Sequence, residues 1–151
     1  MLRRKTAIYA LLSLYDIATH APENSGNKGM RAGDISERHA LPRAYAAKIL
    51  SQLAGAGILH SDRGPRGGFR LQRPSSDISL YEVFQAVGAI ENFEQDDDDL
   101  RKLPVSVRGA IQGVTDHAAD EFKDYLERIS LEDVVTRRPN EVEAPYVESQ
   151  A

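Results

Sequence analysis

The segment GPRGG, residues 64–68, limits what the chain around it can form. Its three glycines and one proline exclude a helix, because glycine loses the most conformational freedom on folding and proline lacks the N–H that a helix uses. It lies between ILHSDR and FRLQR, and apolar and polar residues alternate in the second run, as in a half-exposed strand. The pattern predicts a β-hairpin that holds Arg63 and Arg66 near its tip, where a turn offers fixed positive charge to a partner.

The residues before this hairpin show the apolar spacing of helices. Residues 5–20 predict an amphipathic helix, with an apolar stripe of Ile8, Leu11, Leu12, Tyr15 and Ala18. A short strand at 30–32 and a short helix at 33–39 are expected next, with Asp34 in the first turn of that helix. A third helix is predicted over 42–55, with Pro42 in its first position and a buried stripe of Ala46, Ile49, Leu50 and Leu53. Two helices joined by a tight turn and followed by a β-hairpin form a winged helix-turn-helix.

The second half of the chain predicts two more helices. Either Ser79 or Asp77 caps the first of them, whose apolar residues are Leu80, Val83, Phe84 and Val87. A polar loop at 91–103 contains four consecutive aspartates, and a long helix at 105–129 follows it. Its apolar stripe needs a covering partner, which predicts a dimer interface made of Val107, Ile111, Val114, Ala118, Phe122, Tyr125 and Ile129. Residues 137–151 predict a flexible tail.

The balance of charge changes between the two halves of the chain, near residue 74. Residues 1–74 contain 12 Lys or Arg and 5 Asp or Glu, whereas residues 75–151 contain 7 and 18. A basic half beside an acidic half favours a surface that binds a polyanion and a body that repels it. Uneven solvation of two surfaces would give the same counts.

Composition excludes several classes of function. The chain has no cysteine, and therefore no disulfide, thiolate–metal site or cysteine nucleophile. There is neither a phosphate-binding loop nor a recognisable catalytic pair of carboxylates, and so no enzyme is expected.

The basic start followed by apolar residues is similar to a signal peptide, but Asp16 interrupts it and the helical spacing favours a folded helix. A cytoplasmic location is the expectation.

Duplex DNA is the polyanion that a winged helix-turn-helix fits. The major groove is about 12 Å wide and admits one helix, here 42–55, while Arg63 or Arg66 of the wing reaches the adjacent minor groove. Other basic residues would hold phosphates and fix the register. The candidate DNA-binding residues are Arg3, Arg4, Lys5, Arg31, Arg43, Tyr45, Lys48, Arg63, Arg66 and Arg70.

Three segments carry a resemblance to a known family: GDISERHALPRAY, ILSQLAGAGILHSDRGPRGGFRLQRP and DISLYEVFQAVG. Together with the C-terminal LERISLEDVV, they closely resemble the Rrf2 family of bacterial winged-helix regulators. The iron–sulfur cluster assembly regulator, the nitric-oxide-sensing repressor and the cysteine-metabolism repressor belong to this family. The resemblance implies a homodimer joined through the long helix, a pseudo-palindromic operator, and DNA contact by the wing arginine Arg63.

This chain departs from that family in two ways. Cluster-binding members carry three cysteines in the loop that corresponds to about 91–104, where this chain has four aspartates instead, and so no iron–sulfur cluster is expected. Residues that help the iron–sulfur cluster regulator read bases are polar, whereas this chain has Pro42, Ala44 and Ala47 at those positions. Base reading would then rest on Arg43, Lys48 and Tyr45, on alanine contacts with thymine methyls, or on DNA shape.

The prediction is therefore a mainly α fold with a small β-hairpin. Residues 1–74 form a winged helix-turn-helix domain that binds DNA, and 75–136 form a linker helix, an acidic loop and a dimerisation helix. The expected function is a homodimeric, operator-binding transcriptional regulator, in the role of a repressor, without a cofactor. The alternative is a winged helix that binds another protein, which the apolar residues at Pro42, Ala44 and Ala47 would suit. The effector, whether a small molecule or a protein, is not specified by the sequence.

Overall fold

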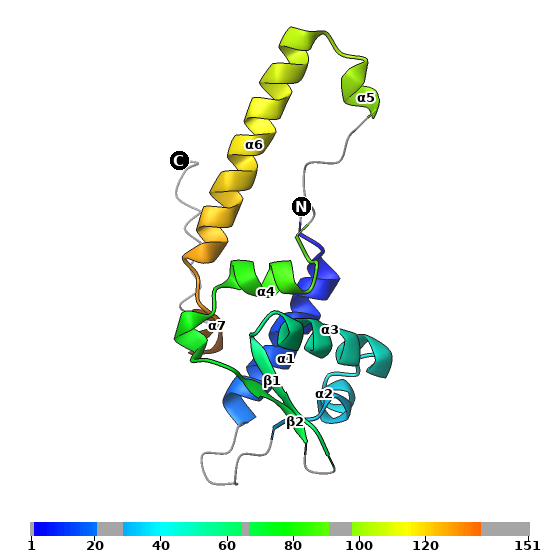
Figure 1. Cartoon of the computed structure of the whole chain (residues 1–151), viewed down its shortest axis with the longest axis vertical. Helices are drawn as coiled ribbons and strands as arrows, with labels where there is room; N and C mark the ends of the chain where they lie inside the picture. The colour runs from blue at the N-terminus through cyan, green and yellow to red at the C-terminus, as the bar shows by residue number, and fades with distance from the viewer. Residues whose placement is uncertain (1, 21–28, 65–66, 91–97, 137–151) are drawn as a thin grey trace, which may run out of the picture.

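The computed structural model describes residues 2–20, 29–64, 67–90 and 98–136 of the 151-residue chain. Figure 1 shows a body formed by the described residues up to 90 together with the last of the described helices, from which one long helix extends. The elements, in chain order, are α1 (Arg4–His20), α2 (Ala32–Arg38), α3 (Arg43–Gly55), β1 (Leu59–Asp62), β2 (Gly68–Leu71), the 3-10 turn η1 (Ser75–Asp77), α4 (Leu80–Ala86), α5 (Asp98–Arg101), α6 (Val105–Glu127) and α7 (Leu131–Thr136). The winged helix-turn-helix prediction is confirmed.

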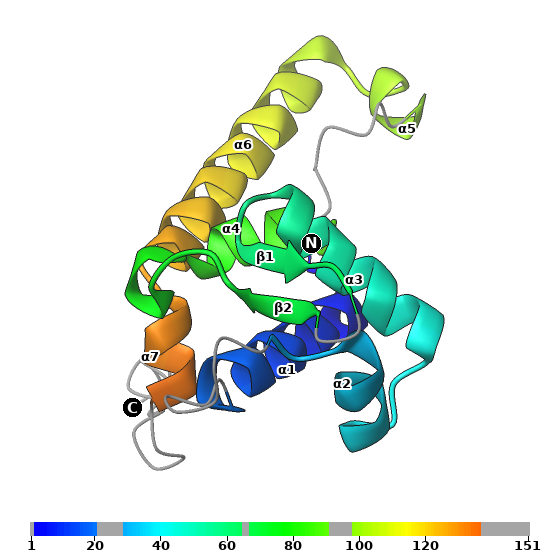
Figure 2. The ribbon, with the colours of Figure 1, turned by 60° about the horizontal axis from the view of Figure 1, so that its bottom comes forward.

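The core of the body lies where α3 meets its neighbours. This helix packs against α1, α2, β1 and α4, and Figure 2 shows it beside both α2 and the hairpin. Its four predicted core residues are buried, as the helical spacing indicated. They join the other fully buried side chains, among them Leu14, Ile17, Ile35, Ile58, Ile78 and Val83.

The start of α3 and the end of α6 differ slightly from the prediction. Pro42 is the residue before α3 and not its first helical position. α6 ends at Glu127, so that Ile129 lies beyond it in the connection to α7. Both shifts are within the one or two residues by which helix ends commonly vary.

The apolar stripe predicted for α1 was wrong about the face that enters the core. Ile8 is 43% exposed and Tyr15 is 45% exposed. The buried residues lie on another face and are Ala7, Ala10, Ser13, Leu14, Asp16 and Ile17. The helix is apolar on two sides, and small alanines let the second side approach α3.

The hairpin is antiparallel, and Leu59 pairs with Leu71 in its register. The short strand predicted at 30–32 reduces to a single bridge, in which Met30 and Phe69 exchange two backbone hydrogen bonds of 2.8 Å. The chain cannot continue as a strand because α2 begins at Ala32.

Two wing glycines are required by packing within the protein itself. A Cβ on Gly68 would lie 2.4 Å from backbone atoms of Gly29, and one on Gly67 would lie 2.2 Å from the carbonyl oxygen of Asp62. No side chain fits at such distances. Close packing, within the wing for Gly67 and against Gly29 for Gly68, therefore explains these two glycines without any contact with DNA.

The second half of the chain returns to the body through α7. Ser79, and not Asp77, caps α4 in a capping box with Glu82, and the four predicted apolar residues of that helix are buried. After α6, the backbone N–H of Leu131 donates to the carbonyl of Ile78 at 2.7 Å, and that of Leu80 donates to Ile129 at 2.9 Å. These bonds fix the lower end of α6 to the body, while the upper part of α6 extends away from it (Figure 1).

Several predicted features lie outside the described residues. They are the loop at 22–29 apart from its last residue, the side chains of the four consecutive aspartates at 96–99, Arg66, and the tail at 137–151. Among the residues that the structure does describe, no helix is long and apolar enough to cross a membrane.

Candidate DNA-binding surface

The outer face of α3 is open to solvent along its length. Arg43, Ala44, Ala47, Lys48 and Ser51 are all exposed, while the opposite face is in the core. The centre of this face has only small side chains, and its two long cations lie at the edges. A face of this shape lets the helix backbone come close to the floor of a groove.

The tight turn between α2 and α3 is fixed by local hydrogen bonds. Ala40 adopts a positive φ of 51°, which reverses the chain within two residues. The Ser36 hydroxyl donates to the carbonyl of Leu41 at 2.6 Å, and the Leu41 N–H donates back to the carbonyl of Ser36 at 2.9 Å. This pair holds the angle between the two helices.

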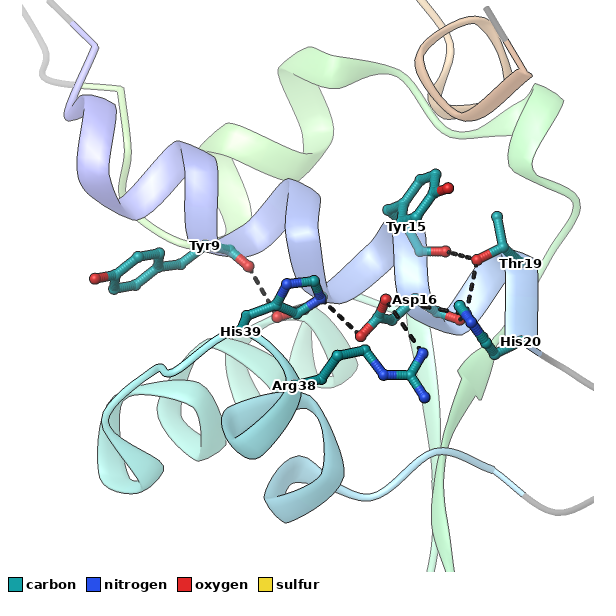
Figure 3. A network of polar contacts seen from close by, with 8 residues as sticks. Tyr9, Tyr15, Asp16, Thr19, His20, Arg38 and His39 are labelled. Atoms are coloured by element: carbon teal, nitrogen blue, oxygen red, sulfur yellow. Dashed lines mark hydrogen bonds and ion pairs between the residues drawn. The ribbon is translucent and has the colours of Figure 1, made fainter. Parts of the chain in front are cut away.

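A buried carboxylate joins α1 to the end of α2, as Figure 3 shows. Asp16 is 1% exposed, and its Oδ2 lies 2.8 Å from Nε2 of His39. Arg38 Nη1 lies 3.7 Å from the other carboxylate oxygen, with His20 Nδ1 at 3.9 Å. The sequence pattern presented Asp16 only as an interruption of an apolar run. A carboxylate within a helical stripe that enters the core requires basic partners, and this was the signal in the sequence that could have revealed the contact.

Tyr45 lies between helices. Its hydroxyl is 2.6 Å from the Thr6 hydroxyl, and its ring meets that of Tyr9 edge to face at 5.4 Å. The Lys5 ammonium lies over the Tyr9 ring at 5.7 Å. Tyr45 therefore joins α3 to α1, and its contact with DNA stays a prediction.

The wing carries an ion-pair cluster on its solvent side. Asp62 accepts a hydrogen bond from Arg70 Nε at 3.1 Å and lies 3.1 Å from His60 Nε2. The hydrogen bond from Arg70 holds the pKa of the Asp62 carboxyl below its ordinary value of 3.8. Arg70, expected to hold a phosphate, is thus partly neutralised by its own wing.

The remaining predicted cations are distributed around this surface. Arg63 is exposed where β1 leads into the wing tip, next to Gly64, whose φ is 108°. Arg31 precedes α2, Arg3 precedes α1 and Arg4 begins it; all three are exposed. Arg43 pairs with Glu37 of α2 at 2.9 Å.

The apolar stripe of α6 is uncovered along much of its length. Val107, Ile111, Val114 and Tyr125 are all exposed, and Val114 is 71% exposed. Ala118 is exposed too, while Phe122 is half-buried against the body. A contiguous apolar surface of this kind on a single chain usually marks an interface.

Comparison with known proteins decides the family. The sequence model of the family Rrf2, described as an iron-dependent transcriptional regulator, matches residues 3–137. The chain belongs to the Rrf2 family. Rrf2 proteins are transcriptional regulators and not enzymes.

Individual Rrf2 relatives agree with this assignment. Over 136 residues the chain is 30% identical to the HTH-type transcriptional regulator IscR of Vibrio parahaemolyticus, covering 85% of this chain and 73% of that protein. The match is shorter for others: it spans 62% of a protein of Aquifex aeolicus named as an HTH-type transcriptional regulator, and 50% of IscR from Cereibacter sphaeroides.

Solved structures of Rrf2 proteins share the fold. Staphylococcus aureus CymR in its oxidised form aligns with a TM-score of 0.66 at 20% identity, covering 91% of this chain and 98% of CymR. T. potens IscR aligns with a TM-score of 0.60 at 23% identity, covering 86% of this chain and 82% of that one.

The residues of this chain do not fit an iron–sulfur cluster held by cysteine ligands. Such clusters are held by cysteine thiolates, and the sequence contains no cysteine. Within the described parts of the chain, no three His, Asp or Glu side chains gather in a way that could hold a metal ion.

Proposed function

We propose that this Rrf2 chain is a homodimeric transcriptional repressor that binds a pseudo-palindromic operator without an iron–sulfur cluster. Residues 1–74 contact DNA, residues 75–136 join the protomers, and the protein acts in the cytoplasm. The observation that carries this proposal is the open, cation-edged face of α3 beside the wing, presented by a rigid helix-turn-helix.

The α3 face suits a major groove. Because Ala44 and Ala47 occupy its centre, the helix can approach the base edges and contact thymine methyl groups. Lys48 and Arg43 at its edges are long enough to reach bases or phosphates. Arg63 then lies on the wing, which reaches the neighbouring minor groove, while Arg3, Lys5 and Arg31 neutralise phosphates at the periphery.

The α6 stripe supports the dimer. A second copy covering the exposed residues of this stripe would remove several large aliphatic side chains from water, each worth about 1.5–3 kcal/mol when fully buried. Two-fold symmetry would then place two α3 helices on one face of the duplex, about one or two helical turns apart.

The test is recovery and sequencing of genomic DNA fragments bound to the purified protein at about 150 mM salt. An inverted repeat shared by the recovered fragments and overlapping promoters supports the operator and the repressor role. The affinity for that repeat should fall steeply with salt, because phosphate contacts release counterions. Transcription from such a promoter in a purified system should decrease when the protein is added.

Uniform recovery of fragments, with weak dependence on salt, would contradict the proposal. It would favour the alternative of a protein-binding winged helix. Activation of the same promoter would overturn the repressor role alone.

A further inference from the structure

The exposed face of α3 has few groups able to read a base by hydrogen bonding. Pro42, Ala44 and Ala47 carry no donor or acceptor in their side chains. Among the exposed residues of this face, the side chains that carry hydrogen-bonding groups are those of Arg43, Lys48 and Ser51. Arginine is the side chain whose two parallel N–H groups match O6 and N7 of guanine, and so the position of the Arg43 guanidinium matters most.

Arg43 does not extend freely from the start of α3. Its Nη2 donates a hydrogen bond to Oε1 of Glu37 at 2.9 Å. A Cβ built on Gly33 would lie 3.7 Å from the same Nη2 and 4.0 Å from Cζ. Gly33 and Glu37 are one helical turn apart on α2, and the guanidinium therefore lies along the outer side of α2, at ordinary contact distance from the position of a Cβ on Gly33.

This arrangement still leaves Arg43 able to read a base. A guanidinium has five N–H donors, and the bond to Glu37 uses one of them. Nη1 and the second hydrogen of Nη2 remain for two parallel bonds. On DNA, where water is excluded from the pair, the carboxylate orients the guanidinium plane for those two bonds.

The pair is weak in the free protein and should strengthen on DNA. The Arg43 side chain is 74% exposed and the Glu37 side chain 71% exposed, and pairs at such sites contribute little. A docked duplex excludes water from the edge of α3, where the same charges interact more strongly.

We propose that Arg43 and Glu37 form one guanine-reading unit, in which Arg43 bonds to guanine in the major groove and Glu37 is its positioning residue. Specificity then depends on a residue of α2 that lies outside the recognition helix. The inference rests on the proposed function, since it needs an operator.

The pairing of Arg43 with Glu37 predicts a change in base-pair selectivity, which a change of net charge alone would not produce. A carboxylate near the duplex repels phosphates, so that Glu37→Gln raises affinity for any DNA while lowering selectivity for one base pair. Asp34→Asn is the matched control, because Asp34 is also exposed on α2 and its loss removes the same charge.

The experiment measures binding of wild type, Glu37→Gln, Asp34→Asn, Arg43→Ala and the Glu37→Gln/Arg43→Ala double variant to the recovered repeat. In the DNA, each guanine in turn is replaced by 7-deazaguanine, which lacks the N7 acceptor. A cooperative thermal unfolding transition of each variant is the control that it is folded. We expect one guanine per half-site at which wild type loses about 10-fold in affinity, because the substitution removes one of the two bonds of the bidentate pair.

At that position, replacing guanine by 7-deazaguanine should not change the affinity of Arg43→Ala. The same replacement should lower the affinity of Glu37→Gln by only about threefold. The double variant should behave as Arg43→Ala does. Asp34→Asn should behave as wild type in selectivity. If either Glu37→Gln or Arg43→Ala discriminates between guanine and 7-deazaguanine as strongly as wild type does, the inference is wrong. The proposed function as a transcriptional regulator would still stand. A wild type without any sequence preference overturns the proposed function, and the inference with it.

Discussion

Asp16 and His39 join two helices that the sequence separates by 23 positions, with a carboxylate oxygen 2.8 Å from the imidazole Nε2. Asp16 is fully buried in α1, and His39 caps the end of α2. The contact fixes the first helix of the helix-turn-helix against the helix beneath it. It therefore acts on the DNA-binding surface although neither residue is on that surface.

Asp16→Asn keeps the shape of the side chain and removes its charge. We expect the free energy of unfolding to fall by about 1–3 kcal/mol, because His39 and Arg38 lose a buried charged acceptor. Chemical denaturation of this variant, of His39→Gln and of the double variant should give a coupling energy above about 0.5 kcal/mol. The exposed Asp34→Asn should change stability by less than about 0.5 kcal/mol. Additive effects of the two single changes would show that the contact does not stabilise the fold.

The capping box of α4 gives a prediction about pH. The hydrogen bond from Arg73, at 2.7 Å, and that from the Ser79 N–H, at 2.9 Å, hold the pKa of Glu82 below its ordinary 4.5. A carboxyl whose folded pKa is lowered stabilises the fold above its unfolded pKa, and the stabilisation is lost as pH falls through the folded value.

Glu82→Gln should therefore cost stability at neutral pH, and the cost should shrink below about pH 4.5 as the wild-type carboxyl is protonated. Ser79→Ala should cost about 1 kcal/mol, since it removes the helix cap. Denaturation at pH 7 and pH 3 measures both effects. Glu132→Gln, an exposed change outside this box, is the control. A Glu82→Gln deficit of equal size at both pH values would contradict the assignment.

Local patterns predicted those parts of the fold that depend on neighbours in sequence. The α3 stripe and the hairpin follow from apolar spacing and from glycines, and the structure contains both. The inward face of α1 could not be predicted, because the helix has apolar residues on two sides and periodicity alone does not choose between them. The choice depends on packing against α3, where Ala7 and Ala10 allow close approach.

The site was less predictable, for a related reason. Arg43 is six positions from Glu37, Arg70 is eight from Asp62, and Tyr45 is 39 from Thr6. Each pairing depends on how separate elements meet, and no spacing rule connects such residues. The sequence could indicate which side chains carry charge, but not which of them another residue holds in place.

The α6 stripe predicts a change in oligomeric state. Ile111→Glu places a carboxylate in the centre of the exposed apolar surface, where a dimer would bury it without a partner. We expect dimerisation to weaken by at least about 2 kcal/mol, roughly 30-fold in Kd. Gln112→Glu, which adds the same charge on another face of α6, should leave the mass unchanged. Light scattering at micromolar concentration would show monomer for the first variant alone, and a dimer in both variants would exclude this stripe as the interface.

Arg63→Ala tests the wing. The side chain is exposed beside the tip, and no other residue of the wing holds it at the positions that the structure describes. Its removal should weaken binding to the recovered operator by about 1–3 kcal/mol and reduce the slope of log affinity against log salt by about one. Arg128→Ala, at the C-terminal end of α6, removes the same charge from a site outside the residues that the proposal places on DNA. Titrations at fixed salt compare the two. If Arg63→Ala weakens binding no more than Arg128→Ala does, then the wing arginine contributes only to net charge and the minor-groove contact is wrong.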